Sequence, residues 1–139
     1  MERSGLVDKI FNTISIFVGI AGGAVAMIFG HWDTILWGLA ALMTLDYVTG
    51  VIKAVYTKSV SSETGYKGIL KKITILVIVA LANIMQVVTG GVVAIREMVI
   101  MFYIANEGIS ILENVAAVSQ RMPDALKNIL LQLRDKNEK

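Results

Sequence analysis

Four long apolar runs, separated by short charged segments, constrain this chain more than any other feature of its sequence. The first, Ile10 to Gly30, has 21 residues without a charge, and as a helix it spans about 31 Å, enough for the hydrocarbon core of a bilayer. The second, Thr34 to Ile52, has Asp46 as its only charge. With 55% hydrophobic and 17% charged residues and a mean hydropathy of +0.68, the chain is too apolar for an ordinary soluble domain. The pattern predicts a membrane protein.

The third and fourth runs are less clear-cut. Ile73 to Ile95 has 23 uncharged residues, although Gly90 and Gly91 favour an earlier helix end with the turn there. Met98 to Val118 is the weakest span by hydropathy because it contains several polar and charged residues. Hydropathy alone therefore does not decide whether the fourth run crosses.

Lysines and arginines favour four crossings, because these residues are retained in short cytoplasmic segments. They cluster in the N-terminal segment, in a loop over 53–72 with five lysines, and in the tail, whereas the turn before the fourth run holds only Arg96. Four crossings place the three basic segments on one side. We therefore expect an all-α, polytopic membrane domain with both termini cytoplasmic. Its helices are expected at about 10–30, 34–52, 73–95 and 98–118.

The two ends of the chain have their own interpretations. Arg3, Lys9 and Ala24-Val25-Ala26 resemble a cleavable signal peptide, but Glu2 and Asp8 and the continuing apolar run favour an uncleaved first helix. After Pro123, apolar residues recur at helical spacing. This predicts an amphipathic helix over 123–134 on the inner membrane surface, with a helix that binds a protein partner as the alternative.

Composition argues against several functional classes. The chain has no cysteine and one histidine, His31, so thiolate or imidazole metal sites are not expected, and no cofactor is expected. The net charge is only +2, and the basic residues lie between apolar runs, so nucleic acid is not an expected partner. Glu107 and Glu113 lie almost two helical turns apart with no nucleophile nearby, so the chain is not expected to be an enzyme.

The fourth run carries its polar residues on one helical face. Their spacing of three and four predicts a stripe of Tyr103, Asn106, Glu107, Ser110, Glu113, Asn114 and Ala117. Asn83 and Gln86 of the third run share a face that could meet this stripe. Because carboxylates and amides are costly in hydrocarbon, the stripe should face other helices or water. Hydrogen bonding inside a closed bundle and lining of a pore both remain open.

Asp46 is a single carboxylate within an apolar run. It lies six residues before Ile52, hence about 9 Å inside that end of its predicted helix. Gly50 follows one turn later and lets a neighbouring backbone approach. The expected cationic partners are Lys53, Lys71 and Lys72. A structural ion pair and a gating or proton-sensing role are the two interpretations.

Small residues recur on the first run and predict helix packing. Ser15, Gly19 and Gly23 form one column, and Gly22, Ala26 and Gly30 form a second beside it. Gly19 and Gly23 make a GxxxG pair, which favours close helix association. The plain alternative is that glycine is common in membrane helices.

Several ordered motifs carry a family resemblance. They are L-D-Y-V-T-G from Leu45, G-Y-K-G-I-L-K-K from Gly65, R-E at Arg96, F-Y-I-A-N-E-G-I-S-I-L-E-N from Phe102, and P-x-x-L-K from Pro123. Over about residues 34 to 134 the chain resembles the phage lysis and toxin-secretion holins, the family that includes the holin of the clostridial large-toxin locus. The departures are Met122-Pro123-Asp124, where a more basic segment is expected, and the length around Gly90-Gly91.

The resemblance implies a protein that oligomerises in the bacterial cytoplasmic membrane and permeabilises it. An endolysin then reaches the cell wall, or a toxin leaves the cell. The expected partners are further copies of the chain, anionic lipid headgroups, and an endolysin or secreted toxin without direct contact. The alternatives are a small membrane channel or transporter subunit, and a membrane adaptor that recruits a soluble partner through its C-terminal helix.

Overall fold

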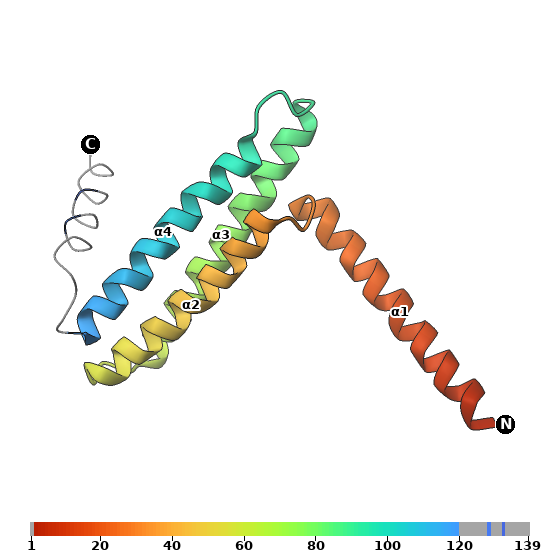
Figure 1. The fold of residues 1–139 in the computed structure, drawn as a ribbon, viewed down its shortest axis with the longest axis horizontal. Coiled ribbons are helices and arrows are strands. Elements are labelled where there is room, and N and C mark those ends of the chain that lie inside the picture. Colours follow the sequence, from red (N-terminus) through yellow and green to blue (C-terminus); the bar gives the residue numbers. More distant parts are fainter. Residues whose placement is uncertain (1, 120–127, 129–131, 133–139) are drawn as a thin grey trace.

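Four α-helices make up the part of the chain that the computed structural model describes, residues 2–119 together with 128 and 132 (Figure 1). They are α1 (Glu2–Phe29), α2 (Thr34–Tyr56), α3 (Ser62–Val88) and α4 (Ile95–Val118). Each is long and apolar enough to cross a membrane. The predicted all-α fold with four membrane helices is confirmed. The predicted amphipathic helix over 123–134 falls outside the described residues, apart from two isolated positions.

Three of the helices form a compact body, and the first splays away from it (Figure 1). α2 packs most extensively against α4, and α3 lies against both. Buried apolar residues at helical spacing make the core: Leu36, Leu39 and Met43 of α2, Ile75 and Val79 of α3, and Ile100 of α4. α1 is exposed along almost its whole length and contacts α3 near its C-terminal end. The three-helix body is therefore the packed unit of the chain.

The connection between α2 and α3 is much shorter than the predicted loop over 53–72. α2 continues to Tyr56, and α3 begins at Ser62 instead of Ile73. Ser61 caps α3 by accepting a hydrogen bond from the backbone N–H of Thr64 at 3.1 Å. The loop prediction was wrong because charges set its limits, whereas lysine is a good helix former. The cap at Ser61, followed by Glu63 in the first turn, is the sequence signal for the earlier start.

The connection between α3 and α4 is built around two glycines. α3 ends at Val88, earlier than the expected Ile95, and Gly90 and Gly91 adopt φ angles of 73° and 72°. The Gly90 N–H donates to the Val87 carbonyl at 3.1 Å and the Gly91 N–H to the Gln86 carbonyl at 2.8 Å, which is the Schellman pattern. α4 consequently begins at Ile95 and includes Arg96 and Glu97, which were expected in the turn.

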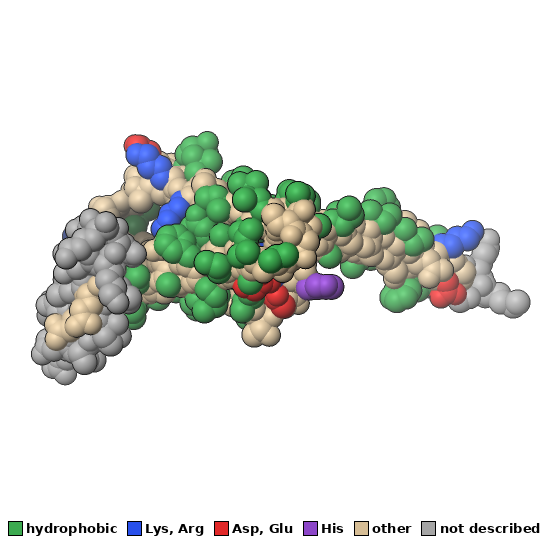
Figure 2. Space-filling view, turned by 90° about the horizontal axis from the view of Figure 1, so that it is seen from above, with side chains coloured by type: hydrophobic (Ala, Val, Ile, Leu, Met, Phe, Trp, Pro, Cys, Tyr) green, Lys and Arg blue, Asp and Glu red, His purple; other side chains and the backbone are tan. Residues whose placement is uncertain are grey.

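Apolar side chains cover the outer surface of both parts. Figure 2 shows them along α1 and over the three-helix body, with His31 at the junction. The most apolar stretch of α1 has no buried residue, and those of the other helices have only 17–22% buried. Surfaces of this kind suit contact with lipid or with further helices.

Candidate functional site

α4 directs a line of mostly polar residues into the three-helix body. Arg96, Ile100, Glu107 and Asn114 are its buried members, and their spacings of four and seven keep them on one side of the helix. The apolar Ile100 separates two polar groups. We call Asp46, Lys72, Glu107 and Asn114 the central cluster, and Asp33, Asn83, Gln86 and Arg96 the turn cluster.

Lys72 joins all three helices of the body in the central cluster. Its ammonium group donates to Asp46 Oδ2 on α2 and to Glu107 Oε2 on α4. Lys71 Nζ lies 3.9 Å from Glu107 Oε1, so two lysines face two carboxylates. The side chain of Glu107 is fully buried and that of Lys72 only 13% exposed. Such charges remain in a low-dielectric interior only when they are paired.

Asn114 completes the central cluster by bonding the same carboxylate. Its Nδ2 donates to Asp46 Oδ1 at 3.2 Å and to Thr49 Oγ1 at 3.3 Å. Gly50 lies beside it, because a Cβ placed on Gly50 would be 3.6 Å from Asn114 Nδ2. The predicted close approach at Gly50 is therefore an approach of α4. Of the three lysines expected to pair with Asp46, the structure pairs Lys72.

The two carboxylates of the central cluster lie near the middle of their helices, whereas Asn114 lies four residues before the end of α4. Asp46 is twelve residues after the start of α2, and Glu107 is twelve residues after the start of α4. Because α2 extends to Tyr56, the carboxylate lies ~15 Å before the end of its helix, compared with the ~9 Å expected from Ile52. Charges within a membrane helix are costly, which accounts for the pairing of Asp46, Lys72 and Glu107.

Arg96 organises the turn cluster. Its Nε donates to the Phe29 carbonyl at 2.6 Å and its Nη2 to the His31 carbonyl at 2.8 Å. Asn83 Nδ2 donates to the carbonyls of Ile28 at 3.0 Å and Met27 at 3.3 Å. The last carbonyls of a helix have no partner within the helix. Here side chains of α3 and α4 supply the partners, and they anchor the end of α1 to the body.

Asp33 links the turn cluster to α2. Its Oδ2 accepts from Arg96 Nη1 at 2.8 Å, and its Oδ1 caps α2 by accepting from the Leu36 N–H at 3.0 Å. The hydrogen bond from Arg96 is the main reason why the pKa of Asp33 lies below its ordinary value, with the Leu36 bond adding to the effect and partial desolvation opposing it. The carboxylate stays charged at neutral pH.

The structure divides the predicted polar stripe of α4. Glu107 and Asn114 are buried, Asn106 and Ser110 are half-buried, and Glu113 is exposed. The face that meets α2 and α3 is thus narrower than the stripe. Within the described part of the chain, Glu107 and Asn114 bond side chains of α3 and α2 and so connect the helices.

Asn83 and Gln86 do not meet the stripe of α4. Asn83 bonds the end of α1, and Gln86 Oε1 accepts from the Arg96 N–H at 2.7 Å. α3 and α4 run in opposite directions, so the end of α3 lies beside the start of α4 (Figure 1). The expected contact with residues 106–114 was wrong for this reason. From the sequence, Arg96 was expected only as a charge in a turn. Its position as a lone arginine next to an apolar run was the signal that its side chain is hydrogen-bonded within the protein.

Of the two small-residue columns, only Gly30, the last member of the second, lies against the three-helix body, where it meets Asn83 and Arg96. Ser15, Gly19, Gly22, Gly23 and Ala26 are all exposed. No atom of another described element would lie within 4 Å of a Cβ added at any of these three glycines. Packing through these columns stays a prediction. The described residues contain no cluster of three or more His, Cys, Asp or Glu side chains suited to a metal ion.

Comparison with known proteins decides the family. The model of the bacteriophage holin family matches residues 23–135. The chain belongs to the bacteriophage holin family. The match starts at Gly23, close to the end of α1 that the turn cluster holds. The family is one of membrane pore-forming proteins and not of enzymes, and its members generally oligomerise in the membrane.

Similar chains occur in several bacteria and in a phage. An uncharacterized protein of Listeria innocua is 41% identical over 120 residues, which cover 85% of this chain and 86% of that protein. An uncharacterized 14.9 kDa protein of Clostridium perfringens is 40% identical over 94% of this chain and 99% of its own length. A protein of Bacillus phage phi105 named probable holin is 30% identical over 72% of this chain and 74% of its own length. No solved structure matches the chain significantly.

Proposed function

We propose that the chain is a holin that self-associates in the bacterial cytoplasmic membrane and opens it, so that an endolysin reaches the cell wall or a toxin leaves the cell. Both termini and the turn between α2 and α3 are cytoplasmic in this proposal. The observation that carries it is the central cluster. In one chain its carboxylates and lysines are paired inside the body, which leaves apolar surfaces toward lipid.

This arrangement suits a protein that accumulates before it acts. While the cluster is paired, no charged side chain of the central cluster needs contact with water. When copies associate, separation of α4 from α2 and α3 would free Asp46, Lys72 and Glu107 to line an aqueous opening. The exposed small-residue columns of α1 are the proposed surface for association.

Induction in growing bacteria that also express an endolysin tests the proposal. We expect abrupt loss of membrane potential followed by release of endolysin activity from the cytoplasm. Sustained growth with an intact potential at high expression would rule out a holin. Selective conductance without passage of protein would indicate a channel instead.

Two glutamates of α4 provide a matched pair of variants. Glu107→Gln weakens the central cluster, whereas Glu113→Gln removes an identical charge from an exposed position on the same helix. We expect Glu107→Gln to shift the time of membrane opening and Glu113→Gln to leave it nearly unchanged. Equal timing in the two variants would contradict a role of the central cluster in opening.

A further inference from the structure

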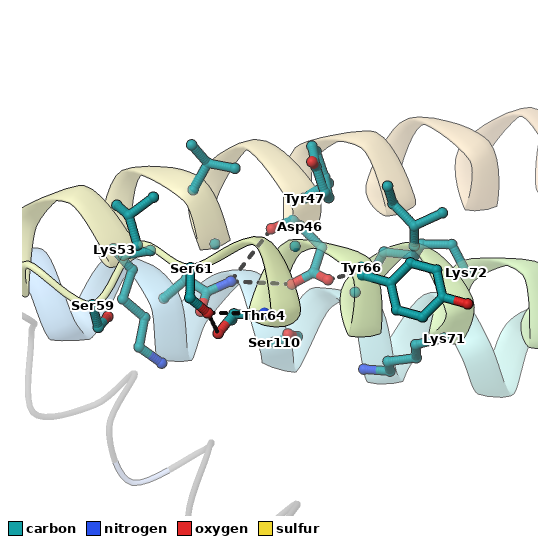
Figure 3. A pocket seen from close by; sticks show the side chains of 18 of the residues that line it. Asp46, Tyr47, Lys53, Ser59, Ser61, Thr64, Tyr66, Lys71, Lys72 and Ser110 are labelled. Carbon is teal, nitrogen blue, oxygen red and sulfur yellow. Dashed lines mark hydrogen bonds and ion pairs between the residues drawn. The ribbon is translucent and has the colours of Figure 1, made fainter.

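A cavity of about 740 Å³ opens between α2 and α3 where the two helices approach their shared turn (Figure 3). Lys53 from the end of α2, Ser61 and Thr64 from the start of α3, and Lys71, which directly precedes Lys72, contribute to its lining. Asp46, Lys72 and Asn114 of the central cluster also line it. The proposed opening of that cluster uses none of the other four side chains, so their place in the cavity needs an explanation of its own.

The lining of the cavity is positively charged. Lys53, Lys71 and Lys72 face a single carboxylate, Asp46, and that carboxylate is already bonded to Lys72. Lys53 has no ion pair among the described residues, and Lys71 Nζ approaches Glu107 Oε1 only to 3.9 Å. In Figure 3 the ammonium groups of Lys53 and Lys71 extend toward the same side. In the part of the chain that the structure describes, Lys53 is thus unpaired and Lys71 is only loosely paired, so both ammonium groups can contribute to binding an anion.

Hydroxyl and amide donors lie between these two lysines. Ser61 Oγ and Thr64 Oγ1 are 2.7 Å apart, so one of their two protons is used within the pair and the other is available to a ligand. Apart from the Thr64 N–H, which donates to Ser61 Oγ, the first N–H groups of α3 have no partner within the helix and add to the positive end of its dipole. Ammonium, hydroxyl and amide donors together suit the oxygens of a phosphate group.

Apolar residues continue the same cavity toward the outer surface. Val51 and Ile69 line it and are 45% and 47% exposed, and Tyr66 beside them is 62% exposed. A free phosphate would leave this apolar part uncovered, whereas a phospholipid would cover both parts. A phospholipid whose headgroup also carries a cation, such as choline, would be disfavoured because the two lysines repel that cation.

We infer that the cavity binds the phosphate of one anionic phospholipid between Lys53 and Lys71, with its acyl chains along Val51 and Ile69. Basic pockets between membrane helices are known binding sites for acidic headgroups. This inference requires only that the chain is embedded in a bilayer. It does not depend on membrane opening, so the two proposals fail independently.

Native mass spectrometry of the full chain, purified in detergent with equal amounts of phosphatidylglycerol and phosphatidylcholine, tests the inference. The unaltered chain is expected to retain one phosphatidylglycerol. Lys53→Gln with Lys71→Gln should reduce this retention roughly 10- to 30-fold. The control, Lys58→Gln with Lys67→Gln, removes the same charge near the same turn but outside the lining, and it should retain the lipid.

Lys53→Gln alone keeps the test independent of folding, because Lys53 makes no ion pair with the central cluster. It should reduce retention roughly fivefold. Equal retention by the cavity variants and the control would overturn the inference. Thermal stabilisation by inorganic phosphate but not by phosphatidylglycerol would also overturn it, because the site would then bind free phosphate. Preference for phosphatidylglycerol that is lost with Lys53 would support it.

Discussion

Lys72 contributes to the structure through two carboxylates from different helices. It donates to Asp46 and Glu107, and its side chain is only 13% exposed. Removal of the ammonium group would leave two buried carboxylates with Lys71 as the remaining cation, at 3.9 Å from one of them. The energetic importance of the central cluster is therefore concentrated in one residue.

We predict that Lys72→Met destabilises the three-helix body by about 3–5 kcal/mol, because loss of one partner strands a buried charge. Lys67→Met is the control, since Lys67 pairs only with Glu63 in an exposed bridge and should cost less than about 1 kcal/mol. Reversible unfolding in mixed micelles, followed by circular dichroism, measures both. Similar losses in the two variants would show that the cluster is not the main polar support of the body.

Gly30 shows how tightly the turn cluster is built. It has a φ of 79°, and a Cβ at this position would lie 2.7 Å from Asn83 Oδ1 and 2.8 Å from Arg96 Nε. Gly90 has a similar φ of 73° but no atom within 4 Å of the same position. The two glycines therefore share the cost of a left-handed backbone and differ in the space around them.

We predict that Gly30→Ala costs at least about 1 kcal/mol more than Gly90→Ala, because only Gly30 has no room for a methyl group. The same unfolding measurement compares them. If the two variants lost equal stability, backbone strain alone would account for both, and the packing of Arg96 and Asn83 on the turn would be unimportant.

At the scale of elements, α1 is a long helix that the body holds at one end. Arg96 and Asn83 bond its last carbonyls, while the rest of the helix is exposed. Arg96 also bonds Asp33, so the charge of one half-buried carboxylate affects how firmly α1 is held. The position of α1 relative to α4 should therefore respond to acid.

The direction of this response follows from the lowered pKa of Asp33. A carboxylate with a lowered pKa stabilises the folded contact above its ordinary pKa, and the stabilisation is lost as the pH falls through the lower value. We predict that spin-label distances between α1 and α4 stay constant from pH 8 to 5 and broaden below roughly pH 4. In Asp33→Asn the side chain at this position cannot titrate, so the α1–α4 distances should not change with pH over the same range. Broadening near pH 6 would implicate another group.

The sequence predicts the elements of this fold better than their contacts. Apolar runs locate four helices because a bilayer requires about 20 apolar residues per crossing. On the same grounds the start of the third helix was predicted too late, because the lysines at 67, 71 and 72 are charged and yet lie within α3. The pairing of Lys72 with Glu107 joins residues 35 positions apart, and only the packing of α3 on α4 determines it. The role of Arg96 likewise depends on where α1 ends.

At the scale of the whole molecule, the four helices alternate in direction. In Figure 1 the start of α1 and the turn between α2 and α3 both lie on the lower side, although far apart because α1 splays away, whereas the turns after α1 and α3 lie on the upper side. The proposed topology puts the lower side of this view in the cytoplasm. Most of the lysines and arginines then lie on the cytoplasmic side, with Arg96 as the exception in the turn cluster.

Because the chain has no cysteine, single substitutions can test this topology without background. We predict that Val92→Cys reacts with a membrane-impermeant maleimide in intact protoplasts, and that Ser59→Cys reacts only after the cells are opened. Both positions are exposed and lie in the two opposite turns. The reverse pattern would invert the proposed orientation, and labelling of both in intact cells would contradict four crossings.

The central cluster also has a consequence for how the chain enters the membrane during synthesis. An isolated Asp or Lys at the middle of a membrane helix costs roughly 2.5–3.5 kcal/mol on insertion. α2 emerges from the ribosome first with Asp46, and its partner Lys72 arrives only with α3, followed by Glu107 with α4. The three helices are thus better released into lipid together than one by one. Biogenesis of this chain is expected to be cooperative, with α2 retained at the insertion machinery until α3 and α4 have been made.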